Sequence, residues 1–92
     1  MIGSFRHKGM RKLFDTGSRA GVEAVYADRI ARILARLNIS ERPEDVNAPG
    51  FKLHPLKGDM KGFWSVSVSA NWRIFFRFIG TDAHDVDLID YH

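Results

Sequence analysis

The sequence has no cysteine and no long apolar run, and each absence excludes a class of protein. Without cysteine, the 92-residue chain has no disulfide framework and no zinc site with thiolate ligands. No apolar stretch approaches the roughly 18 residues of a membrane-spanning helix. The basic N-terminus also lacks the apolar segment of a secretory signal. We therefore expect one cytoplasmic domain over residues 1–92.

Charge is spread unevenly along the chain. The formal net charge is +3, from 14 Lys and Arg against 11 Asp and Glu. Residues 1–14 contain four basic residues and no acidic one, namely Arg6, Lys8, Arg11 and Lys12. The C-terminal segment is acidic, with Asp82, Asp85, Asp87 and Asp90. This distribution predicts a basic groove with carboxylates near one end, suited to a polyanionic partner.

Two helices are predicted in the first half of the chain. Apolar residues at helical spacing predict a short helix from Lys8 that ends near Thr16, and a longer one over residues 21–38. Residues 1–5 are compatible with a short strand. Arg29, Arg32 and Arg36 lie opposite the apolar stripe of the longer helix. They indicate either a solvated face or a contact with RNA or an acidic partner. A polar linker with a single helical turn near Pro43 follows over residues 40–50.

The second half predicts an antiparallel meander. Residues 51–53 are expected to form a short strand that Pro55 ends, because proline cannot donate to a ladder. Strict alternation predicts strands over residues 63–69 and 73–79, and a last strand over residues 84–91. Arg73 and Arg77 fall on the wet face of this sheet.

His54, Lys57 and Arg73 are candidates for chemistry, and so are the last three residues of the chain. His54 lies where a strand meets a loop, and Lys57 lies in a loop with two glycines. A lone histidine is more often structural and a loop lysine more often solvated, so neither is specific alone. The chain ends on Asp90, Tyr91 and His92 directly after an apolar strand. An Asp beside a His can orient the imidazole and stabilise its charged form, although a solvated chain end explains the same pattern.

These segments together carry a family resemblance. KLHPLKGD, then GFWSVSVSANWRIFFRF, then a terminal DYH resemble the HigB toxins of the RelE superfamily, and IGSFRHKGMRKLF is similar in pattern. The resemblance implies an α+β fold, with two N-terminal helices packed on a mostly antiparallel sheet. It implies ribosome-dependent mRNA cleavage in the decoding site, without metal or cofactor. It also implies a HigA-like helix-turn-helix antitoxin as partner. The matched active-site positions are His54, Lys57, Arg73, Asp90, Tyr91 and His92.

The residue types at these positions suit RNA cleavage. A 2′-hydroxyl that attacks its own phosphate needs a base, cations for the phosphorane charge and an acid for the leaving oxygen. We expect His92, oriented by Asp90, to be the base, and Lys57 and Arg73 to hold the phosphate. His54 is the acid or a second phosphate contact, the two histidines being exchangeable, and Tyr91 stacks on or orients a base. Two alternatives stay open: a noncatalytic RNA- or ribosome-binding module, and a protein-interaction domain built on the arginine-rich helix.

Overall fold

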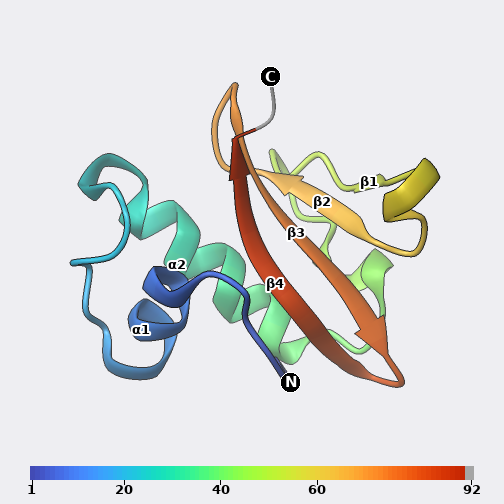
Figure 1. Ribbon diagram of the computed structural model, residues 1–92, viewed down its shortest axis with the longest axis horizontal. Coiled ribbons are helices and arrows are strands. Elements are labelled where there is room, and N and C mark those ends of the chain that lie inside the picture. The colour runs from blue at the N-terminus through green and yellow to red at the C-terminus, as the bar shows by residue number, and fades with distance from the viewer. Residues whose placement is uncertain (91–92) are drawn as a thin grey trace.

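An antiparallel sheet with helices on one side forms the protein, and the computed structural model describes residues 1–90 (Figure 1). The strand order is β1-β2-β3-β4. The elements are α1 (Lys8–Thr16), α2 (Ala24–Ile39), the short 3-10 turns η1 (Pro43–Val46) and η2 (Gly58–Met60), and the strands β1 (His54–Pro55), β2 (Trp64–Ser67), β3 (Trp72–Ile79) and β4 (Asp82–Asp90). The predicted α+β class is confirmed, and both helices precede the strands in the sequence.

The strand register separates a core face from an open face. Val66, Ile74 and Leu88 are cross-strand partners, and the first two are fully buried beneath the helices. Ser65 pairs with Phe75 one position away. Directly paired residues of antiparallel strands share a face, and neighbours along a strand alternate. Arg73, which lies two residues before Phe75, therefore projects from the open face, as the alternation predicted.

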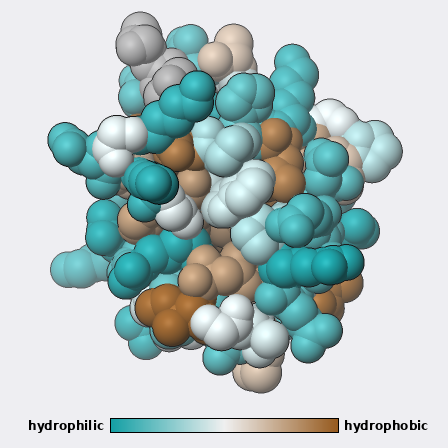
Figure 2. Space-filling view, turned by 90° about the vertical axis from the view of Figure 1, so that its right-hand side faces the viewer, coloured by the Kyte–Doolittle hydropathy of each residue, from teal (hydrophilic) through white to brown (hydrophobic). Residues whose placement is uncertain are grey.

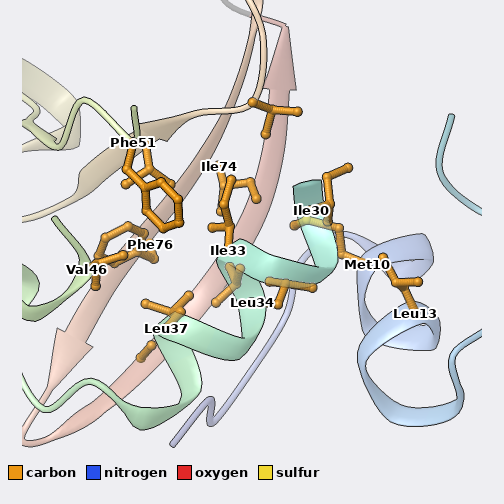
Figure 3. Close-up of a cluster of buried hydrophobic side chains, with 14 residues drawn as sticks. Met10, Leu13, Ile30, Ile33, Leu34, Leu37, Val46, Phe51, Ile74 and Phe76 are labelled. Carbon is orange, nitrogen blue, oxygen red and sulfur yellow. The ribbon is translucent and has the colours of Figure 1, made fainter. Parts of the chain in front are cut away.

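The core lies between α2 and the sheet. Along α2, Ile30, Ile33, Leu34 and Leu37 are fully buried, at the spacing that gives one apolar stripe. Figure 3 shows this stripe facing Ile74 and Phe76 of β3, with Met10 and Leu13 of α1 at one end and Val46 and Phe51 at the other. Within residues 1–90, neither helix is long and apolar enough to cross a bilayer.

Two predicted elements in the first half differ from the structure. Residues 1–5 do not form a continuous strand, because only Ile2 and Phe5 make isolated parallel bridges, to Ala83 and Val86 of β4. The predicted helix over residues 21–38 begins only at Ala24. Residues 20–22 form a turn instead, which brings the backbone of Gly21 against that of Gly9 in α1.

The predicted strand over residues 51–53 is wrong. Lys52 has φ of 52°, in the left-handed region that interrupts an extended strand. Phe51 is instead buried in the core, and β1 begins only at His54. The carbonyl of Lys52 is thereby turned toward Arg73, which donates to it from Nη2 at 3.0 Å.

The arginines of α2 have a structural role that periodicity did not reveal. Arg29 donates from Nε and Nη2 to the Ser67 carbonyl, and from Nη2 to the Gly50 carbonyl at 2.8 Å. Arg36 donates from Nε to the Asp45 carbonyl at 2.7 Å. Arg29 therefore ties α2 to the end of β2 and to the segment before β1, and Arg36 ties it to η1. Arg32 is exposed on the same helix.

A carboxylate closes the turn around η1. Asp45 accepts a hydrogen bond from the Glu41 N–H at 3.1 Å and pairs with Arg42. The hydrogen bond from Glu41, aided by Arg42, holds the pKa of Asp45 below its ordinary value. The predicted single turn near Pro43 is thus confirmed. Asp45 accepts hydrogen bonds at both ends, from Arg36 at its carbonyl and from the Glu41 N–H at its carboxylate.

Candidate active site

Two of the predicted site residues meet on the open face of the sheet. His54 of β1 is the cross-strand partner of Ser65 in β2. Ser65 also contacts Arg73, which lies two residues along from its other partner, Phe75, in β3. The short β1 strand thus brings the imidazole and the guanidinium to opposite sides of one serine. Figure 2 views the molecule from the side where β1 and β2 lie, and hydrophilic side chains dominate that view.

Arg73 is fixed by two hydrogen bonds. Its Nε donates to Ser65 Oγ at 2.9 Å, and its Nη2 donates to the Lys52 carbonyl at 3.0 Å. A guanidinium has five N–H donors in a rigid fork, so these two bonds leave donors for a ligand. The left-handed conformation of Lys52 turns its carbonyl to meet this side chain. The result is a cation with a defined orientation.

A small pocket lies where these residues converge. It encloses about 170 Å³ and is lined by His54, Leu56, Ser65 and Arg73. Its size suits one phosphate or part of a nucleotide more than a drug-sized ligand, for which sites of about 300–1,000 Å³ are usual. Its polar lining combines a titratable imidazole with a fixed positive charge, which is the combination that phosphoryl chemistry uses.

Ser65 was not predicted as a site residue. Its side chain is polar, yet it is only 1% exposed and accepts the bond from Arg73. The signal available in the sequence was alternation, which puts Ser65 on the same face as Arg73. Alternation does not reveal which of the three serines at positions 65, 67 and 69 lies beside that arginine.

The other predicted site residues are less closely placed. Lys57 is exposed just ahead of η2, three residues beyond His54. Asp90 ends β4 as the cross-strand partner of Trp72, so the alternation of β3 puts it on the side opposite to Arg73. Tyr91 and His92 lie outside the described residues. The described structure therefore joins His54 with Arg73, leaves Lys57 outside the pocket that they line, and puts Asp90 at the end of β4 on the opposite side.

A larger groove lies elsewhere and lacks this chemistry. It has a volume of about 540 Å³ and runs between α1 and the turn that precedes α2. Lys8, Arg11, Lys12 and Asp15 line it, with no histidine among its lining residues. Among residues 1–90, no three His, Cys, Asp or Glu side chains cluster closely enough to hold a metal ion.

Two toxins of known structure share this architecture. The YoeB/ParE toxin from Agrobacterium tumefaciens superposes with a TM-score of 0.64 at 22% identity, covering 100% of this chain and 99% of that one. YafQ from E. coli strain BL21(DE3) superposes with a TM-score of 0.56 at 11% identity, covering 98% and 93%. At such identities the likeness establishes the fold.

Sequence comparison establishes the family. The chain is 47% identical over 92 residues to Endoribonuclease HigB of Proteus vulgaris, covering both proteins completely. The family model for the RelE-like toxin of the type II toxin-antitoxin system HigB matches residues 3–92. The chain belongs to this HigB family of toxins, which confirms the resemblance found in its motifs.

Proposed function

We propose that this toxin is a ribosome-dependent endoribonuclease that cleaves mRNA in the ribosomal A site. The observation that supports this most is the pocket in which His54 and the fixed guanidinium of Arg73 converge. The 47% identical relative from Proteus vulgaris is itself named an endoribonuclease. Cleavage of mRNA stops translation and growth, and a cognate antitoxin prevents it.

The proposed reaction uses the RNA's own hydroxyl. A base removes the 2′-hydroxyl proton, the 2′-oxygen bonds to the adjacent phosphorus, and the bond from phosphorus to the 5′-oxygen breaks. An acid gives a proton to that leaving oxygen, so the products are a 2′,3′-cyclic phosphate and a 5′-hydroxyl. This route moves two protons and stabilises a negative phosphorane, so it needs no metal ion.

Each role goes to a residue whose chemistry fits it. Arg73 and Lys57 hold the scissile phosphate, with Arg73 already oriented by Ser65 and the Lys52 carbonyl. His54 lies across the pocket from Arg73, where it can serve as acid or as a second phosphate contact. His92 acts as base, oriented by Asp90, and Tyr91 stacks on or orients a base. Histidine suits either proton role because its ordinary pKa of about 6.5 lies near working pH.

The partners follow from the toxin family. We propose that the toxin acts in the cytoplasm on mRNA bound to the ribosome. We also propose that a HigA-like antitoxin with a helix-turn-helix neutralises it. The exposed basic residues Lys8, Arg11 and Lys12 of α1 are available to contact ribosomal RNA, whereas Arg29 and Arg36 of α2 already bind backbone carbonyls of the toxin itself.

Primer extension on mRNA tests the ribosome dependence. Purified protein is added to mRNA alone and to the same mRNA on programmed ribosomes. We expect cleavage only with ribosomes, at A-site codons, and its loss in His92→Ala, because that variant removes the proposed base. An undiminished cut in free mRNA would refute ribosome dependence. Ribosome binding without any cleavage would favour a noncatalytic binding module instead.

A further inference from the structure

A second group of charged side chains lies on the open face, toward the other end of β3 from Arg73. Arg77 donates from Nε to Asp85 Oδ2 at 2.7 Å, and Arg6 Nε lies 3.6 Å from Oδ1 of the same carboxylate. Both guanidinium groups also lie over the Phe63 ring, 5.5 Å from its centroid for Arg6 and 5.7 Å for Arg77. We call Arg6, Phe63, Arg77 and Asp85 the arginine cluster.

The arginine cluster has surplus positive charge and free donors. One carboxylate neutralises only one of the two guanidinium groups, so the cluster keeps a net charge of about +1 at neutral pH. Both arginines are held through Nε. Within residues 1–90, the terminal nitrogens of Arg6 and Arg77 have no hydrogen-bond partner, and the two side chains are 53% and 43% exposed. Such a fork matches a phosphate.

The backbone is distorted to build this arrangement. Asp85 has φ of 54°, and the register between β3 and β4 shifts at the same place, between Phe75 and Arg77. The N–H of Asp85 is satisfied by Ser4 Oγ at 2.8 Å. Bulges and left-handed residues that re-aim a side chain concentrate at binding and catalytic sites. Here they aim one carboxylate at two arginines that come from distant parts of the chain.

The arginine cluster and the pocket lie on the same face of one strand. Arg73 and Arg77 are four residues apart in β3, which is about 13 Å along an extended strand. Ser65 and Phe75 lie between them on that face. A single RNA strand whose scissile phosphate sits at Arg73 can therefore run in the direction of β3, above the buried side chains of Ser65 and Phe75, to Arg77 and Phe63.

We propose that the arginine cluster is a second subsite for the same single-stranded RNA, binding a backbone phosphate a few nucleotides from the scissile one. The inference rests on the proposed function, because it presumes that the substrate is RNA held at Arg73. Phosphate contacts position a strand without reading its sequence. The cluster therefore sets the register of the RNA in the pocket and contributes affinity, not bond breaking.

Binding of uncleavable RNA of two lengths tests the subsite. The probes are labelled single-stranded RNAs with 2′-O-methyl groups, which have no hydroxyl to attack the phosphate. One spans only the pocket, and the other reaches the arginine cluster. For the long probe, Arg77→Gln is expected to weaken binding about tenfold. It is also expected to reduce the slope of log affinity against log salt concentration by about one. For the short probe, it is expected to leave the affinity unchanged. Fluorescence anisotropy measures both.

Arg32→Gln is the matched control, because it removes one positive charge, as Arg77→Gln does, but from an exposed position on α2. Equal weakening by both variants, or equal weakening with both probe lengths, would overturn the subsite. So would an Arg77 effect that appears only with ribosomes and never with the long probe. Arg77→Lys keeps the charge but lacks the fork, so its affinity should be intermediate if the fold is intact. If the protein cleaves no mRNA yet shows the length-dependent loss, the proposed function fails and the subsite stands.

Discussion

Replacing Arg73 with lysine is expected to lower the rate of mRNA cleavage on programmed ribosomes about a hundredfold, in the range found when one preorganised donor to transition-state charge is removed. Lysine keeps the positive charge, but it is a flexible point charge without the planar fork. It cannot bind Ser65 Oγ and the Lys52 carbonyl while also donating to a phosphate, whereas Arg73 binds both and keeps further N–H donors for a ligand. The rate at saturating protein is the quantity to measure, by single-turnover primer extension.

Arg32→Lys is the control for this experiment, because Arg32 is exposed on α2, on the helix side of the sheet. It should cleave as the unchanged protein does. The thermal midpoint of Arg73→Lys should fall by no more than about 4–16 °C, since a part-exposed pair of hydrogen bonds contributes about 1–2 kcal/mol and each kcal/mol shifts the midpoint of a domain of this size by about 4–8 °C. If Arg73→Lys cleaves at the original rate, the guanidinium is not positioned for the reaction.

The second large effect is expected on stability, at the contact between α1 and the turn before α2. An added Cβ at Gly9 would overlap the carbonyl group of Gly21, and one at Gly21 would overlap the Cα of Gly9. Backbone atoms cannot rotate away as a side chain does. Gly9→Ala should therefore lower the free energy of unfolding by about 1–3 kcal/mol, although alanine favours a helix by about 1 kcal/mol. The midpoint of urea unfolding measures the change.

Lys8→Ala provides the comparison, because Lys8 is exposed one position earlier in the same helix. Its effect should lie within about 0.5 kcal/mol. An unchanged or higher stability of Gly9→Ala would show that the two segments separate without loss, and the close packing of Gly9 on Gly21 would then not define the fold.

The sheet was predictable where one face is buried and the other is wet. Strict alternation located β3 to within one residue and assigned Arg73 and Arg77 to the open face, because a slip by one residue would bury both arginines. The helices were predictable for the same reason, since α2 has one buried apolar face and an opposite polar face. The start of α2 was not, because residues 20–22 form a turn in which Gly21 packs on Gly9, a tertiary contact that the local sequence does not reveal.

The site was predictable only in part. His54 and Arg73 were identified through family motifs, and the structure brings them to one pocket. Their connection through Ser65 depends on strand register, which periodicity does not fix. The arginine cluster was missed because Arg6 and Asp85 are distant in sequence and meet only when the first residues lie beside β4. The predicted roles of Tyr91 and His92 stay predictions, because both lie outside the described residues.

The chemical ends of the cut mRNA test the central proposal most directly. Message cleaved on programmed ribosomes is isolated, and the two ends at the cut are identified by mass spectrometry. Attack by the 2′-hydroxyl, assisted by the histidines and Arg73, predicts a 2′,3′-cyclic phosphate on one fragment and a 5′-hydroxyl on the other. A 3′-hydroxyl paired with a 5′-phosphate would show that water, not the RNA, is the nucleophile, and would contradict the proposed mechanism.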